Sequence, residues 1–397
     1  MREAVRELTQ RQQEVFVPLV HRPGEAQMDF GHALVKRNGV LRKVAFFVMA
    51  LPYSDAVYVQ AFERECTETF WEGHVQAFAF FGGVPRRITY DNTKVAVSQI
   101  LGRERRLTRG FLQLKSHHLF DHHFCHVRRG NEKGVVEGLV KFTRLNFFVP
   151  VPQVRDFDEL NAFLRERCEA DRQRRLRGQT GAKAQLLVED QAAFLPLPAV
   201  PFEACRRVST TASSLSLVRF DSNDYSVPVR WAHHPIVVKG DWQEVVLCAQ
   251  GEVVARHRRR WDTEQVSFEP LHYLALLERK PGALDHARPL AGWTLPECFL
   301  LLRRRLEAER EGEGTREYIR VLRLLEKHSL AAVRSAVEQG LRAGALTRDA
   351  IAQFLYPCED WRVTTFSLAG HPHLQHVKVA TADVQQYESL LLAGGVA

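Results

Sequence analysis

The stretch AQMDFGHALVKRNGVLRKVAFFVMA, residues 26–50, decides the fold class of this chain. Apolar and β-branched residues lie on both sides of Asn38-Gly39, a dipeptide that favours the tight turn of a hairpin. We therefore expect two antiparallel strands here. DAVYVQAF, residues 55–62, is rich in strand-forming residues and predicts a third strand.

The residues that follow alternate between helix and strand patterns. TETFWEGHVQAFAFF (67–81) predicts a helix that ends at Gly82. The later elements are predicted as a strand, a helix, a strand and a helix: RRITYD (86–91), residues 108–119, HHFCHV (122–127) and the segment that opens at Asn131. The order β-β-β-α-β-α-β-α is that of the RNase H-like fold, so we expect an α/β core with a mixed five-stranded sheet and flanking helices.

The pattern changes near Pro150. Residues 156–180 look helical and basic, and 186–206 are proline-rich, which is typical of a linker. Short alternating strands from Val208 to Arg258 predict a small β-barrel, and helical periodicity follows. The expected segments are a lead-in (1–22), the RNase H-like core (23–152), a basic helical linker (153–206), the small β-barrel (207–262) and a mostly helical C-terminal region (263–397).

Composition narrows the class of protein. The 55 Lys and Arg exceed the 47 Asp and Glu, a balance of +8 that favours a polyanion partner but leaves an ordinary basic enzyme open. The seven cysteines form no C-x-x-C pair, which suits a reducing cytosol. The N-terminus has no apolar signal region, and the run VAFFVMAL is too short to span a bilayer. We expect a cytoplasmic protein with no membrane partner.

Three carboxylates fall where this fold brings its elements together. Asp29 lies in the middle of the first predicted strand and Asp91 at the end of the fourth, and these strands are neighbours in an RNase H-like sheet. A third carboxylate on the helix after the last strand can close the site. Three converging oxygen ligands suit Mg²⁺, with Mn²⁺ as a possible substitute. Two such ions can activate a nucleophile and stabilise a leaving oxygen on phosphorus.

The helix RRGNEKGVVEGLVKFTRLNFFVP (128–150) offers two glutamates for the third position. If Asn131 caps this helix, Glu132 lies in its first turn, where a carboxylate complements the helix dipole. Glu137 lies a turn deeper, with Lys141 and Arg144 on the same face. The two glutamates are roughly 140° apart around the helix, so only one can face the site. We predict Glu137.

HHLFDHHFCH, residues 117–126, contains the residue types of a zinc site. Its spacing lacks a two-plus-two ligand arrangement, and neighbouring strand residues point to opposite faces. A helix end, a turn and the last core strand are the favoured interpretation.

Four motifs give the chain a family resemblance. PGEAQMDFG, ITYDNTKVAV and GNEKGVVEGLVKFTRLNFFVP resemble the catalytic blocks of the IstA-type insertion-sequence transposases, within the DDE transposases and retroviral-type integrases. NDYSVPVRW, followed by VVARHRR, resembles their post-catalytic β-barrel. The resemblance implies Asp29, Asp91 and Glu137 as the metal-binding triad of a DNA transposase. It also implies bacterial, nucleoid-associated DNA integration and recombination, carried out as a multimer because two element ends must be joined.

Basic runs at 103–109, 165–177 and 256–260 could each be solvated surface, but beside a phosphoryl-transfer site they favour contact with a phosphate backbone. The expected DNA-binding residues are Asn92, Lys94, Lys141, Arg144, Arg174, Arg175, Arg256, Arg258 and Arg259. The resemblance adds a protein partner, an AAA+ ATPase of the IstB type, and the amphipathic C-terminal helices are a docking candidate.

One feature departs from the family pattern. Members usually begin with a helix-turn-helix DNA-binding region, whereas only residues 1–22 precede the catalytic block here. A catalytically inactive or domesticated DNA-binding remnant is therefore one alternative function. An RNase H-type nuclease that cuts without joining is the other, although a simple nuclease does not need the barrel and the basic linker.

Overall fold

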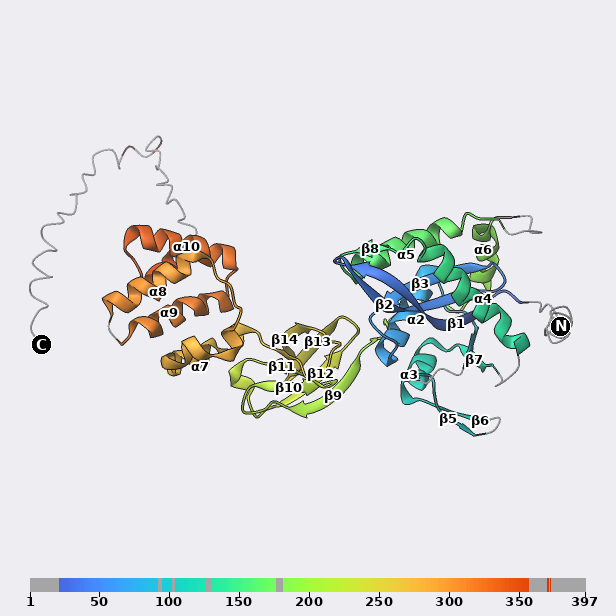
Figure 1. Cartoon of the computed structure of the whole chain (residues 1–397), viewed down its shortest axis with the longest axis horizontal. Helices are drawn as coiled ribbons and strands as arrows, with labels where there is room; N and C mark the ends of the chain where they lie inside the picture. Colours follow the sequence, from blue (N-terminus) through green and yellow to red (C-terminus); the bar gives the residue numbers. More distant parts are fainter. Residues whose placement is uncertain are drawn as a thin grey trace, which may run out of the picture. The chain divides into compact units, whose positions relative to one another are not determined.

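The computed structural model describes the chain in several stretches that fall into two compact units (Figure 1). The described residues are 21–91, 95–101, 104–125, 130–175, 181–310, 312–356, 370 and 372, without the side chains of 98–101, 104–105 and 130–137. The units are Met1–Thr294 and Leu295–Ala397. No helix within the described stretches is long and apolar enough to cross a membrane.

The first unit is built on a mixed sheet with the strand order β3-β2-β1-β4-β7. Strand β2 runs antiparallel to β1 and β3, whereas β4 runs parallel to β1 and to β7. The mixed five-stranded sheet predicted from the sequence is therefore present, and the short β8 pairs with the far end of β1. The strands are β1 (Glu25–Arg37), β2 (Val40–Leu51), β3 (Ala56–Phe62), β4 (Arg87–Tyr90), β7 (Asp121–Phe124) and β8 (Gln153–Val154).

The turn between β1 and β2 has the backbone that its two residues favour. Asn38 and Gly39 both take positive φ angles, 49° and 80°, as a type I′ turn requires. This turn matches the right-handed twist of its strands, and it sets the register that places Gln27 opposite Ala50. The predicted hairpin is confirmed.

Helices cover both faces of this sheet (Figure 1). Phe47 of β2 contacts His74 of α2 edge to face, whereas Phe46 stacks on Phe148, just after α4. Successive strand residues point to opposite faces, so α2 and the end of α4 lie on opposite sides of the sheet. The helices are α2 (Thr67–Phe81), α3 (Arg109–His118), α4 (Gly130–Phe147), α5 (Phe157–Asp171) and α6 (Lys183–Ala193).

The histidine-rich stretch forms the elements that its spacing favours. Helix α3 ends at His118, and Leu119 reverses the chain with a φ of 63°. Strand β7 follows from Asp121 to Phe124. The predicted helix end, turn and core strand are confirmed, and His126 lies outside the described residues.

The region predicted as a linker is partly helical. Helix α5 ends at Asp171 instead of near residue 180, and α6 occupies residues for which we expected a proline-rich linker. The first proline of that stretch is Pro196, so residues 183–193 are free of helix breakers. The Nζ of buried Lys183 lies 2.7 Å from carboxylate oxygens of both Asp171 and Asp55, which ties α6 to the core.

A second difference lies between β4 and α3. The sequence there predicts only a basic segment, but the chain forms the hairpin of β5 (Val97–Leu101) and β6 (Glu104–Leu107).

The small β-barrel predicted for residues 207–262 corresponds to residues 206–267, whose strands form two sheets around one core. The strand orders are β14-β13-β12-β9 and β10-β11-β15. Val218, Val238 and Leu247 bring both sheets into this core. The strands are β9 (Arg206–Thr211), β10 (Leu217–Phe220), β11 (Asn223–Ser226), β12 (Pro235–Gly240), β13 (Glu244–Ala249), β14 (Glu252–Arg258) and β15 (Val266–Ser267). Helix α7 (Leu274–Arg279) follows.

The second unit is helical, as the periodicity predicts. Ile319, Leu322, Val333 and Val337, the residues of the predicted apolar stripes, are all buried within it. The predicted N-cap is confirmed, because the hydroxyl of Thr347 accepts a hydrogen bond from the Ala350 amide. The helices are α8 (Glu297–Glu309), α9 (Gly314–Leu322), α10 (Leu330–Ala343) and α11 (Arg348–Gln353).

Candidate active site

The two predicted catalytic aspartates lie on neighbouring strand paths. Met28 of β1 and Tyr90 of β4 pair in parallel register. Asp29 directly follows Met28, and Asp91 directly follows Tyr90. Neighbouring strands lie about 4.8 Å apart, so the backbone register alone brings these residues together. Both side chains are partly exposed, as a site open to substrate requires. The Oδ1 of Asp29 accepts a hydrogen bond from the Phe30 amide at 2.8 Å.

The pleat of the sheet separates this pair from the aromatic core. Met28 and Tyr90 are fully buried, and the Tyr90 ring packs beside Phe70 of α2. Because side chains alternate between faces, Asp29 and Asp91 belong to the opposite face. That is the face on which Phe46 stacks against the residue after α4.

Helix α4 runs along β1 in the direction of the strand. The Nε of Arg144 donates to the carbonyl of His32 at 2.9 Å. Beyond the helix, the carbonyl of Pro152 accepts from the amide of Lys36, near the end of β1. The earlier turns of α4 therefore approach the part of β1 that holds Asp29.

The described part of the donor set fits a hard divalent cation. The strand register brings the backbones of Asp29 and Asp91 together, and carboxylate oxygens are the ligands that Mg²⁺ prefers. Among the described side chains, no group of three or more His, Cys, Asp or Glu could hold a metal ion. The side chains of Glu132 and Glu137 lie outside the described residues, so the choice of Glu137 as the third ligand stays a prediction.

Four of the predicted DNA-binding residues are expected near this face, and the structure describes the side chains of two of them. Asn92 and Lys94 lie outside the described residues. Lys141 and Arg144 are exposed on α4, one turn apart. Burial, followed by the charges of Lys43 and Arg144, lowers the pKa of His32. Positive charge therefore gathers around this part of β1.

Arg174 and Arg175 follow α5 and are exposed. Arg174 forms an ion pair with Asp171 at 2.9 Å, and its guanidinium lies 5.6 Å from the ring centre of Phe142 on α4. Arg175 forms a β-bridge with Ala182. Both arginines are surface residues, and Arg174 lies near α4, but Asp171 offsets part of its charge.

The arginines of β14 and of the residue directly after it differ in exposure. Arg256 is exposed and forms an ion pair with Glu244 at 3.2 Å, and Arg258 is exposed as well. Arg259 is buried, with 5% of its surface exposed. The predicted role of a DNA-contacting surface cation does not fit Arg259.

Arg259 closes a charge cluster between the mixed sheet and the two-sheet domain. Its Nη2 lies 2.9 Å from an oxygen of Asp221 and 3.3 Å from one of buried Glu68, at the start of α2. Arg206 pairs with both acids and Arg64 with Asp221. Burial alone would raise the pKa of Asp221, but the bond from Arg259 and the charges of the three arginines lower it.

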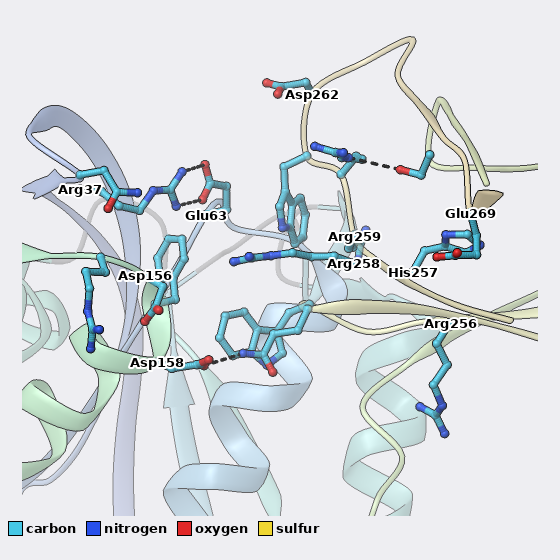
Figure 2. Close-up of a pocket in the computed structure, with 18 of the residues that line it drawn as sticks. Arg37, Glu63, Asp156, Asp158, Arg256, His257, Arg258, Arg259, Asp262 and Glu269 are labelled. Carbon is cyan, nitrogen blue, oxygen red and sulfur yellow. Dashed lines mark hydrogen bonds and ion pairs between the residues drawn. The ribbon is translucent and has the colours of Figure 1, made fainter. Parts of the chain in front are cut away.

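A groove of about 950 Å³ lies beside this cluster (Figure 2). The close-up shows the ion pair of Arg37 and Glu63 on one side of the groove, and Arg258 and Arg259 lie on the other side. Six arginines and five carboxylates line the groove, so its positive excess is small. Asp29 and Asp91 are not among its lining residues, which separates it from the carboxylate site.

The sequence does not predict the charge cluster, because its members lie far apart in the chain. Glu68 reads locally as an acid in a first helical turn, and Asp221 as a turn residue. One signal was available: strand alternation places Arg259 on the face of buried Ala255. An arginine at an inward position predicts a buried acidic partner, but its identity depends on the tertiary fold.

Comparison with known sequences finds transposases. Residues 197–269 match the family model described as Mu transposase, C-terminal domain. A transposase of Aminobacter aminovorans is 33% identical, over 97% of this chain and 77% of that protein. The transposase for insertion sequence element IS21 of Pseudomonas aeruginosa is 30% identical, over 68% of this chain and 69% of that protein.

Among solved structures, the HTLV-2 integrase catalytic core domain in complex with magnesium covers 42% of this chain. The match includes 97% of the integrase chain, with 17% sequence identity and a TM-score of 0.30. The sheet, the aspartate pair and the sequence matches together define the class, the DNA transposases. The chain belongs to the IS21-type family of insertion-sequence transposases, as the motifs predict.

Replacing Arg259 with Met tests the charge cluster. Removal of the Arg259 guanidinium takes one of two arginines from buried Glu68 and leaves Arg206 as its partner, so unfolding of the first unit should become about 1–3 kcal/mol easier. Arg258→Met, at the exposed neighbour, should change stability by less than about 0.5 kcal/mol. Urea unfolding of both variants measures the difference, and equal losses would contradict a structural role for Arg259.

Proposed function

We propose that this transposase carries out metal-dependent cleavage of DNA 3′ ends and strand transfer during insertion-sequence transposition. The observation that carries the proposal is the register of β1 and β4, which sets Asp29 beside Asp91. A purely DNA-binding remnant has no use for two adjacent carboxylates on the face of a sheet, whereas phosphoryl transfer requires them.

The mixed sheet is, in this proposal, an RNase H-like integrase catalytic core that takes in residues 23–152. Its order β3-β2-β1-β4-β7, with β2 antiparallel to both of its neighbours, supports that assignment. Residues 153–206 connect this core to a DNA-binding β-domain at 207–262, and the region from 263 onward is mostly helical.

Glu137 is proposed as the third carboxylate. It lies seven residues before Arg144 on the same side of α4, about 10 Å along the helix axis. Asp29 lies three residues before His32, about 10 Å along the strand. Arg144 bonds to His32 and the two elements run in one direction, so these equal offsets support the proposal that Glu137 lies near Asp29. Glu132, roughly 140° around the helix, complements the helix dipole instead.

Asp29, Asp91 and Glu137 would hold Mg²⁺, for which Mn²⁺ can substitute. When bound, two such ions lower the pKa of the attacking oxygen and neutralise charge on the leaving oxygen. The protein contributes preorganisation, because the strand register sets Asp29 and Asp91 side by side before substrate arrives.

The reaction then has two steps. Water attacks the phosphodiester at the element end, and the bond to the flanking strand breaks to release a 3′-hydroxyl. That hydroxyl attacks a phosphodiester of the target, which joins the strands and expels a target 3′-oxygen. Lys141 and Arg144 would pair with phosphates beside the reacting bond. Asn92 and Lys94, which follow Asp91 in the chain, would contact the same strand.

The alternative functions differ in what they omit. A DNA-binding remnant would neither cut nor join, and an RNase H-type nuclease would cut without joining. The adjacent aspartates disfavour the first, and the match of residues 197–269 to a transposase domain disfavours the second. The protein would act as a homo-oligomer on DNA, since two element ends must be joined together.

Amide substitution of the triad tests the chemistry. Asp29→Asn, Asp91→Asn and Glu137→Gln should each lower cleavage and strand transfer at least about 100-fold in Mg²⁺, because each removes charge needed in the transition state. DNA affinity should persist. Glu132→Gln is the matched control and should retain activity. Near-normal joining by any of the three would remove that residue from the site.

The exposed arginines of β14 and its exit are proposed to contact the DNA backbone instead of base edges. Arg256 and Arg258 point to solvent, and Arg260 is exposed with its Nε bonded to Ser267. Such cations act on the phosphates of any sequence.

Neutralising Arg256, Arg258 and Arg260 together with Gln should weaken binding of all duplex sequences alike. The slope of log affinity against log salt should fall by up to about 0.9 for each lost phosphate contact. Arg334→Gln, at an exposed arginine of α10, is the control. A loss confined to one sequence, or an unchanged slope, would argue against backbone contacts.

The helical unit 295–397 is proposed to dock an AAA+ ATPase of the IstB type. The residues of its predicted apolar stripes are buried in the core of the unit, so they cannot form the docking surface. Leu300 and Leu301 of α8 are each 50% exposed and line a groove of about 550 Å³ with Leu341. This groove is the better candidate.

Removal of the unit after Thr294 should leave cleavage of a model end intact and abolish ATPase-assisted insertion. Leu300→Asp with Leu301→Asp keeps the unit and should lower insertion about tenfold or more, the effect of losing an apolar hot spot. Co-purification with the ATPase provides the direct measurement. Normal insertion by both proteins would exclude this unit as the docking site.

A further inference from the structure

A buried hydrogen-bond chain ends at the residue before Asp91. His74 of α2 is fully buried; its Nδ1 lies 2.7 Å from the Phe70 carbonyl oxygen and its Nε2 lies 2.9 Å from the Tyr90 hydroxyl. Burial lowers the pKa of His74 to about 3, so the ring is neutral. A carbonyl only accepts, so Nδ1 carries the proton and Nε2 accepts from the hydroxyl of Tyr90.

These hydrogen bonds fix the orientation of the Tyr90 ring, which its apolar contacts alone would fix only weakly. The Tyr90 ring packs against Phe70, Phe111 and Phe124, with ring centres 5.3–5.9 Å apart. Apolar contacts of this kind are largely non-directional, whereas a hydrogen bond constrains both distance and angle. The bond to His74 therefore sets how the Tyr90 ring is turned and how deep it lies.

The backbone of Tyr90 is held as well. Its carbonyl accepts from the Cys125 amide at 3.0 Å, which ties the end of β4 to the chain after β7. On the other side, Tyr90 is the last residue of β4 in register with β1. Side chain and carbonyl are thus both fixed at the residue from which Asp91 extends.

We propose that His74 and Tyr90 are positioning residues that hold the Asp91 carboxylate in reach of Asp29. The inference rests on the proposed role of Asp91 as a metal ligand. Two apolar side chains could fill the space of His74 and Tyr90. The hydrogen bond between these two residues adds a fixed orientation at the end of β4. Neither residue touches substrate, since both are buried on the aromatic face of the sheet.

Direct Mn²⁺ binding to the full-length protein tests this role without DNA or turnover. Tyr90→Phe keeps the ring and removes the hydroxyl. It should weaken Mn²⁺ binding, measured by calorimetry, about tenfold, the lower end of the effect of losing a residue that supports a metal ligand. Tyr58→Phe is the matched control, because Tyr58 is buried on β3 and its hydroxyl also donates one bond, to Gln60. That variant should bind Mn²⁺ like the unmodified protein.

Two changes at His74 separate positioning from simple loss of packing. Gln places its amide near the position of Nε2 and can still accept from Tyr90, whereas Asn reaches only the position of Nδ1. His74→Gln should therefore keep Mn²⁺ affinity, and His74→Asn should lose it as Tyr90→Phe does. This pair carries the test even if Tyr90→Phe does not fold.

The outcomes separate a failure of the positioning role from a failure of the proposed metal site. If Asp91→Asn binds Mn²⁺ normally, the proposed metal site and the positioning role are both wrong. If Asp91→Asn loses binding while Tyr90→Phe and His74→Asn retain it, only the positioning role is wrong. Equal losses in Tyr58→Phe and Tyr90→Phe would assign the effect to general destabilisation and would also overturn the inference.

Discussion

The parallel pairing of β1 with β4 is the constraint on which the rest of the mixed sheet depends. Met28 opposite Tyr90 sets the register, and the pleat then sends consecutive residues to opposite faces. One face receives Met28 and Tyr90 and becomes part of an aromatic core beneath α2 and α3. The other receives Asp29 and Asp91. A slip of β4 by one residue would turn its side chains to the opposite faces and would bury Asp91 among aromatic rings.

The same pairing links stability to the site. Aromatic packing on one side of β4 holds the strand end, and the carboxylates on the other side gain a rigid base. Side chains on or directly after strands gain positional accuracy from the sheet, which loops do not provide. The bond from Tyr90 to His74 extends that accuracy one residue beyond the last paired position.

Charge serves two purposes in the first unit. The cluster of Arg259, Asp221 and Glu68 is buried and joins the β-domain to α2, so it belongs to the architecture. Arg256 and Arg258, on the same strand, face solvent and remain available to a polyanion. Basic composition alone cannot separate these purposes, because a paired internal arginine and an exposed one look identical in a sequence.

Local patterns by themselves determined the strands and helices of the core, the hairpin at Asn38-Gly39, the cap at Thr347 and the candidate carboxylates. Each of these depends on residues within a few positions of one another. The sequence misplaced α6, missed the hairpin of β5 and β6, and assigned Arg259 to the surface. Only the tertiary structure decided that Arg259 is buried, that His74 reaches Tyr90, and that Met28 pairs with Tyr90 in the register of β1 and β4. The physical reason is that register and ion pairing join residues far apart in the chain, and no local preference encodes the identity of a distant partner.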